Sequence, residues 1–232
     1  MDTDTLTLGL VWYWAFLFST VAHEAAHAWT AYRLGDPTAY HEGQVSLDPI
    51  PHIRREPLGT VAFPLVTYLM GGWMMGWASA PYDPFWAATY PRKAAWMALA
   101  GPLANLTIAV AAGIAIRLGM LAGIFVMPES AYFTEVTLGI PGGWWHGAAM
   151  FLSILFTLNV VLFTFNLIPL YPLDGSVAIT LLMNERLTER YREFTMNPTL
   201  SMFGLVIAWQ LFDPIFRPLF RVALQCLYPG HF

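Results

Sequence analysis

The chain has 232 residues, of which 57% are hydrophobic, 16% are aromatic and only 11% are charged. An ordinary soluble domain carries about 25% charged residues, so this composition excludes a disordered chain and argues against a soluble globule. The net charge of −4 offers no basic face, which excludes nucleic acid as a partner. The single cysteine, Cys226, excludes an internal disulfide and a metal site built from cysteines.

The first long apolar run, residues 6–32, predicts a helix that crosses a membrane. Tryptophan and tyrosine side chains lie near both of its ends, as is typical of the two membrane interfaces. From Trp12 to Tyr32 a helix rises about 30 Å, which is the thickness of a hydrocarbon core. The residues before this run lack the basic charge of a secretory signal, so we expect the run to be retained as a membrane helix.

The next part, residues 40–80, is expected to lie at the membrane interface or to re-enter the membrane. Residues 43–47 alternate in polarity and predict a short strand. Residues 58–80 are apolar, but Pro64, Gly71, Gly72 and Gly76 interrupt them. Irregular backbone at membrane depth must be covered by protein or water, so this run is predicted to be re-entrant or interfacial.

Two more spanning helices are predicted at residues 94–117 and 144–175, and residues 176–232 are expected to form gate-like helices. In that last part Pro214 and Pro218 separate two apolar runs, which allows one broken span or a hairpin. The predicted fold is one membrane-embedded domain over residues 1–232. It is an all-α polytopic membrane protein with about four to six helices, a re-entrant or interfacial segment and a small β element.

The basic residues predict the orientation of these helices. Only Arg117, the last residue of the second predicted span, lies at the end where the second and third spans are joined, whereas eight basic residues lie in loops at the other end of the spans. By the positive-inside rule the first helix then runs from outside to inside. We therefore expect a multi-pass protein of the cell membrane, with its functional site nearer the cytoplasmic side. The eight residues are Arg33, Arg54, Arg55, Arg92, Lys93, Arg186, Arg190 and Arg192.

The first predicted helix contains an HExxH motif formed by His23, Glu24 and His27. Residues four apart share one helix face, so both imidazoles can point at one zinc ion while the glutamate handles the attacking water. The alternative is a helix with two ordinary buried histidines. A charged group at the centre of a membrane helix costs at least about 2.5 kcal/mol, which favours the functional interpretation.

A catalytic zinc ion usually has three protein ligands and an open position for water. The candidates for the third ligand are Asp174, His41, His52 and His146. The predicted topology places Asp174 on the same side as the second half of the first helix and places His146 on the far side. Asp174 would also suit the N-cap of a helix at residues 176–183. His41 and His52 follow the first helix, where they are candidates for a zinc neighbour or for solvated loop residues.

Three motifs occur in order along the chain: HExxH at residues 23–27, AGPxxN at residues 100–105 and NxxPxxPLDG at residues 166–175. Together they resemble the site-2 protease family of intramembrane zinc metalloproteases, in its compact bacterial branch without a PDZ domain. The resemblance implies one Zn²⁺ ion per chain, bound by His23, His27 and Asp174. It also implies that Glu24 is the general base.

The resemblance extends to polar groups around this set. It implies that Asn166 holds the substrate or the developing oxyanion, for which an interhelical hydrogen bond is the alternative. Asn105 is interpreted as a helix-packing residue that is also a candidate to reach the site, and His41 and His52 are candidate inhibitory groups. Residues 43–47 resemble the membrane-associated sheet of the family, whose edge can pair with an unwound substrate.

The expected function is hydrolysis of peptide bonds within or next to transmembrane helices. The partners implied are the lipid bilayer and a single-span membrane protein as substrate. Two alternatives stay open: a membrane zinc transporter, which would need ligating groups at several depths, and an inactive, substrate-binding homologue. The sequence leaves the natural substrate and the oligomeric state open.

Overall fold

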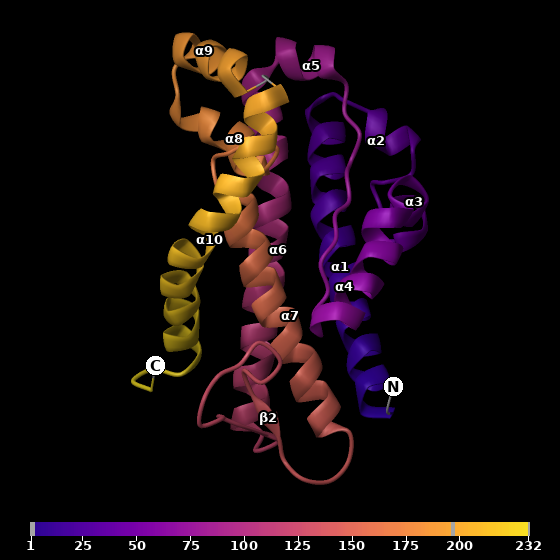
Figure 1. Ribbon diagram of the computed structural model, residues 1–232, viewed down its shortest axis with the longest axis vertical. Coiled ribbons are helices and arrows are strands. Elements are labelled where there is room, and N and C mark those ends of the chain that lie inside the picture. Colours follow the sequence, from indigo (N-terminus) through magenta and orange to yellow (C-terminus); the bar gives the residue numbers. More distant parts are fainter. Residues whose placement is uncertain (1–2, 196–197, 232) are drawn as a thin grey trace.

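The computed structural model of the protein describes residues 3–195 and 198–231. Within these residues, four helices are long and apolar enough to cross a membrane. They are α1 (Thr3–Leu34), α6 (Pro91–Leu121), α7 (Trp145–Asn166) and α10 (Pro198–Leu227). The expected all-α polytopic class is therefore confirmed, and Figure 1 shows these helices running along the long axis of the molecule.

The packed centre forms where α1, α6 and α7 meet. Trp12, Ile116 and Ile154, one from each helix, are fully buried there. Lipid is as apolar as these side chains, so close packing rather than exclusion from water holds membrane helices together. Small residues on α6 permit that packing, since a Cβ at Gly113 would already lie 3.3 Å from the ring of Phe156.

Short helices α2 (Thr38–His41) and α3 (Pro49–Arg55) lead into a segment that runs back along α1. The π-helix η1 (Leu58–Ala62) and helix α4 (Phe63–Gly71) run down beside α1, and the chain then returns in extended form to α5 (Pro84–Thr89). Figure 1 shows that this excursion begins and ends toward the same end of the molecule. This path is that of a re-entrant segment.

The two arms of the re-entrant segment are held against each other and against α1. The backbone N–H of Trp77 donates to the carbonyl oxygen of Gly59 at 3.1 Å. A Cβ at Gly76 would collide with that same oxygen, so the arms approach this closely only because glycine stands there. Near the tip, the Tyr68 hydroxyl donates to the carbonyl of Thr5 at 2.7 Å and fixes α4 to α1.

Residues 43–47 do not form the predicted strand. The backbone N–H of Gln44 donates to Ala39 at 2.9 Å, which folds the chain back on α2. The Asp48 side chain then accepts the backbone N–H of Ile50 at 2.9 Å and caps α3. These local side-chain and turn bonds compete with strand pairing, and this is why the alternating pattern misleads here.

The β structure of the described chain lies in the connection between α6 and α7 instead. Strands β1 (Phe125–Val126) and β2 (Leu138–Gly139) pair antiparallel. Figure 1 shows them at the opposite end of the molecule from α8 and α9.

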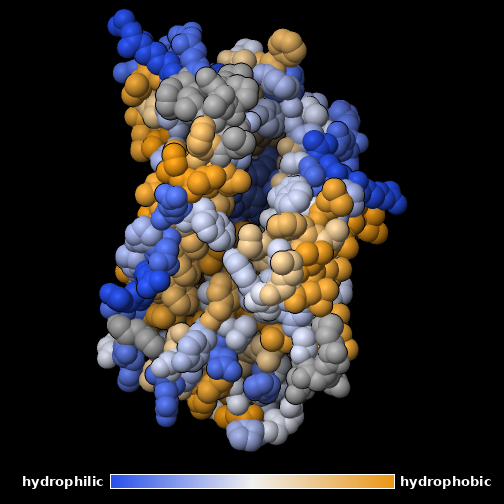
Figure 2. Space-filling model, viewed as in Figure 1, coloured by the Kyte–Doolittle hydropathy of each residue, from blue (hydrophilic) through white to orange (hydrophobic). Residues whose placement is uncertain are grey.

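After α7 the chain forms α8 (Asp174–Ala178), the 3₁₀ helix η2 (Ile179–Leu182) and α9 (Glu185–Thr195). Helix α10 then runs without interruption through Pro214 and Pro218. The structure therefore selects a single span over the hairpin. Figure 2 shows a hollow in the upper part of this face, between α10 and the segment that rises to α5, with hydrophilic atoms at its floor.

Candidate metal centre

The HExxH residues lie on the part of α1 that faces α6, at membrane depth. His23, Glu24 and His27 are all buried, each with 7% of its surface exposed. His27 lies seven residues before the end of α1, so it lies about 10 Å below that end at 1.5 Å per residue. The Nε2 atoms of the two histidines point toward one another and lie 3.0 Å apart.

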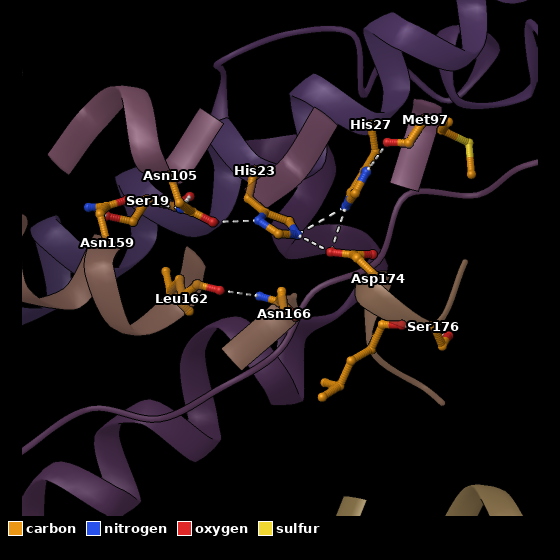
Figure 3. Close-up of polar contacts among 11 residues, drawn as sticks. Ser19, His23, His27, Met97, Asn105, Asn159, Leu162, Asn166, Asp174 and Ser176 are labelled. Carbon is orange, nitrogen blue, oxygen red and sulfur yellow. Dashed lines mark hydrogen bonds and ion pairs between the residues drawn. The ribbon is translucent and has the colours of Figure 1, made fainter. Parts of the chain in front are cut away.

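Asp174, the first residue of α8, completes this cluster from the other side (Figure 3). Its Oδ2 atom lies 3.0 Å from Nε2 of His23 and 3.3 Å from Nε2 of His27. Two protein ligands of a tetrahedral zinc ion, each about 2.0–2.1 Å from the metal, lie about 3.3 Å apart. The three atoms therefore form a triangle of the size that one metal ion requires.

The other ring nitrogen of each histidine shows which one carries the proton. Nδ1 of His23 donates to the amide oxygen of Asn105 at 2.5 Å, and Nδ1 of His27 donates to the carbonyl of Met97 at 2.7 Å. Because both partners can only accept, both Nε2 atoms present lone pairs to the carboxylate of Asp174. Three electron-rich atoms converge at one point, and this donor set fits a divalent cation.

Helix α6 leaves room for this cluster at one position. A Cβ at Gly101 would collide with Nε2 of both His23 and His27. Glycine therefore lets the α6 backbone pass directly beside the imidazoles, which explains the glycine of the AGPxxN motif.

Glu24 stands beside the three-atom set rather than in it. Potential ligand atoms of His23, Glu24 and His27 all lie within 4.8 Å of one another. The carboxylate of Asp174 makes the shorter contacts with both histidines. The Glu24 carboxylate is thus a buried acidic group next to the cluster.

A stretch that contains all four of these residues, 12–211, matches the sequence model of peptidase family M50. The chain belongs to peptidase family M50. This is the site-2 protease family that the three motifs resemble, so that prediction is confirmed.

Two similar proteins are named "putative zinc metalloprotease". YwhC of Bacillus subtilis is 35% identical over 160 residues, which are 68% of this chain and 63% of the relative. Rip2 of Mycolicibacterium smegmatis is 31% identical over 164 residues, which are 71% of this chain and 54% of the relative. The chain thus spans less than two thirds of either relative. No solved structure matches the chain.

The other predicted ligands lie apart from the M50 cluster. His52 is buried in α3, and its Nε2 atom donates to the carbonyl of Ser46 at 3.1 Å, so it holds the turn before that helix. His41 is exposed and packs edge-on against the Tyr40 ring. His146 is the second residue of α7, whose start lies at the opposite end of the molecule from α8. In the described residues no hydrogen bond or ion pair joins these three to the cluster.

The two asparagines named from the motifs take different places. Asn105 contacts His23 directly, so it reaches the site as well as packing between helices. Asn166 is the last residue of α7, and its Nδ2 atom donates to the carbonyl of Leu162 at 3.0 Å (Figure 3). Asp174 is not the N-cap residue of a helix. Leu173 takes the N-cap position of α8, and the Asp174 carboxylate points toward the histidines.

Sequence reasoning missed two polar residues that support this centre, Ser19 and Asn159. Both are fully buried and bond to each other across α1 and α7. A signal was available, because Ser19 lies one helical turn before His23 and Asn159 lies two turns before Asn166. Polar groups at that spacing inside a membrane span mark one inward face.

Proposed function

We propose that the chain is a zinc metalloprotease that hydrolyses peptide bonds within or next to the transmembrane helices of membrane proteins. The observation that carries the proposal is the triangle of His23, His27 and Asp174 at membrane depth, with Glu24 beside it. The printed names of the YwhC and Rip2 relatives, which include zinc metalloprotease, support the choice of metal and reaction.

The three ligand residues hold the metal, and a bound zinc ion supplies a readily ionised water molecule and polarises the scissile carbonyl. Glu24 accepts a proton from the attacking water and passes it to the leaving amine. Burial of Glu24 among α1 neighbours keeps that proton from bulk solvent. Asn105 and the carbonyl of Met97 keep the imidazoles aimed at the ligand position throughout.

Asn166 is suited to bind the carbonyl oxygen of the substrate. An amide nitrogen has two N–H donors, and Leu162 accepts one of them. The second donor is left for a substrate carbonyl, where it would stabilise the charge that develops during attack.

The depth of the site defines the substrate class that we propose. A transmembrane helix hides its amides in internal hydrogen bonds, so it must unwind before a carbonyl reaches the cluster. Single-span substrates with helix-breaking residues near the cleaved bond should therefore be preferred. The hollow in Figure 2 is the opening through which we propose that this segment and water reach the site.

The same reasoning extends to the orientation and location of the protein. The basic residues near α2, α3, α5 and α9 favour an inner membrane of a bacterium with the site nearer the cytoplasm. A zinc transporter would need ligating groups at several depths. In the described residues one group of metal-ligating side chains is present, which favours the protease.

The test is cleavage of a single-span substrate by the purified protein in proteoliposomes. The Glu24→Gln variant should bind zinc like the wild type and lose at least about 10²-fold in rate, because general base catalysis contributes that much. Undiminished cleavage by this variant would rule out the assigned base. Zinc flux into the same vesicles without cleavage would favour the transporter, and zinc binding with neither activity would favour the inactive homologue.

A further inference from the structure

A network of hydrogen bonds lies on the side of His23 away from Asp174, where α1, α6 and α7 meet (Figure 3). Nδ2 of Asn105 donates to Oδ1 of Asn159 at 2.8 Å, and Nδ2 of Asn159 donates to the hydroxyl of Ser19 at 2.8 Å. The Ser19 hydroxyl donates in turn to the carbonyl of Ala15 at 2.7 Å. The side chains of Ser19, Asn105 and Asn159 belong to residues with 0% exposure.

The donors and acceptors of this hydrogen-bond network fit together in only one arrangement. Nδ2 of Asn105 faces two acceptors, Oδ1 of Asn159 and the carbonyl of Ser19, the latter at 3.3 Å. Its amide oxygen must therefore face His23 and accept from Nδ1. If the Asn105 amide turned over, its N–H groups would face the N–H of His23. His23 would then move its proton to Nε2 and lose its lone pair toward the cluster.

We infer that Asn159, supported by Ser19, is a positioning residue for the metal centre. It touches neither metal nor substrate, but it fixes the Asn105 amide and thereby keeps the Nε2 lone pair of His23 at the ligand position. The inference rests on the proposed zinc site. Residues that orient a metal ligand without contacting the metal contribute about 10- to 100-fold to metal affinity. Asn159, which lies on α7, is assigned that role.

Asn159→Leu removes the acceptor and keeps the size of the side chain. Thr157→Val is the matched control, because Thr157 is also buried on α7 and its hydroxyl has no hydrogen-bond partner among the described residues. Zinc affinity is measured by chelator competition, and the protonated ring nitrogen of His23 is read by ¹⁵N NMR of the metal-free protein. We expect Asn159→Leu to bind zinc about 10- to 100-fold more weakly and to shift the His23 proton to Nε2. Thr157→Val should do neither.

Wild-type zinc affinity in folded Asn159→Leu, or an unchanged His23 proton, would overturn the inference. If Asn159→Leu does not fold, Ser19→Ala replaces it, because it removes the hydroxyl that accepts from Asn159 and leaves the Asn159 side chain in place. Failure of the wild type itself to bind zinc would instead overturn the proposed function.

A second inference comes from α10, which carries charge in the middle of a candidate membrane span. Asp213 lies ten residues after the start and fourteen before the end of the span Phe203–Leu227. Arg217 forms an ion pair with it at 2.8 Å, yet their side chains are 74% and 60% exposed. Arg221 follows one turn later and is exposed. Lipid is a poor neighbour for such groups, which usually face protein or a water-filled cavity.

These charges belong to a line of exposed residues along α10, which we call the seam. The spacing is alternately three and four residues, which is the repeat of helices that pack side by side. The family model stops at residue 211, before the charged part of the seam, so that part lies outside the matched M50 region. The exposed residues of the seam are Phe203, Val206, Gln210, Asp213 and Arg217.

We propose that a second copy of this chain covers the seam. Two copies in one membrane share their orientation, so their α10 helices pair in parallel about a two-fold axis. Asp213 of each copy then lies about one turn from Arg217 of the partner subunit, and two symmetric ion pairs form. A seam of one charge sign could not pair with itself in this way.

Oxidative crosslinking of purified protein in liposomes tests the pairing, in a Cys226→Ala background. Gln210→Cys on the seam should form a covalent dimer, and Leu219→Cys on the opposite face, also exposed, should not. Arg217→Asp should abolish the Gln210 crosslink, and adding Asp213→Arg should restore it. Absence of the Gln210 crosslink, equal crosslinking at Leu219, or no rescue by the exchanged pair would overturn the proposal.

Discussion

Gly101 is the point at which the α6 backbone passes the imidazoles of His23 and His27. No side chain fits there, because a Cβ would collide with both Nε2 atoms. At the scale of single residues, the proposed metal centre thus depends on the missing side chain at Gly101 as well as on its proposed ligands. The carbonyl of Met97, one turn before Gly101, fixes the His27 ring from the same helix.

We predict that Gly101→Ala weakens zinc binding, since an added methyl group in a packed site costs about 1–3 kcal/mol. That cost corresponds to about 5- to 150-fold in affinity. Gly147→Ala on α7 is the control, because no atom of the described part of the chain lies within 4 Å of its Cβ position. Chelator competition measures both variants, and an unchanged affinity in Gly101→Ala would contradict the crowding seen at α6.

At the scale of elements, Asp36 joins α1, α2 and α5. It is 1% exposed and accepts the backbone N–H of Thr38 at 3.0 Å, the Thr38 hydroxyl at 2.6 Å and the backbone N–H of Asp83 at 2.8 Å. Burial by itself raises the pKa of Asp36, but these hydrogen bonds outweigh it, so its net pKa lies below the usual range. These hydrogen bonds attach the end of the re-entrant segment to the chain just after α1.

We predict that Asp36→Asn lowers the free energy of unfolding by about 1–3 kcal/mol at pH 7, because it removes bonds to a charged acceptor. A lowered folded-state pKa stabilises the protein above the unfolded value of about 3.9, and this stability is lost as the pH falls through the folded value. The loss caused by the variant should therefore shrink below about pH 4. Thermal unfolding in detergent micelles measures it.

The control for this prediction is Asp48→Asn. Asp48 is exposed and caps α3, and asparagine caps as well as aspartate. A loss in Asp36→Asn that is equal at pH 7 and pH 3 would show that charge on Asp36 contributes nothing.

At the scale of the whole molecule, the site, α5 and α9 lie toward one end, and β1 and β2 lie at the other (Figure 1). We predict that single cysteines at Thr89 and Glu193 react with an impermeant thiol reagent from the cytoplasmic side. A cysteine at Glu129 should react from the opposite side. All three positions are exposed, and the background is Cys226→Ala. Labelling of all three from one side would contradict the proposed orientation.

The spanning helices and the convergence of the two HExxH imidazoles could be predicted because each depends on a local pattern. Long apolar runs define α1 and α7, and the HExxH spacing places two imidazoles on one face whatever surrounds them. Asp174 followed from the motif resemblance. The path of residues 43–47 could not be predicted, because capping by Asp48 decides it. The role of Asn159 could not be predicted either, since its partners come from two other helices.

The central claim is that His23, His27 and Asp174 bind the metal while Glu24 does not. The most direct measurement is zinc content per chain after purification and dialysis, for the wild type, Asp174→Ala and Glu24→Gln. The account predicts one zinc ion per chain in the wild type and in Glu24→Gln, and loss of the ion from Asp174→Ala. Retention of zinc by Asp174→Ala together with its loss from Glu24→Gln would contradict it.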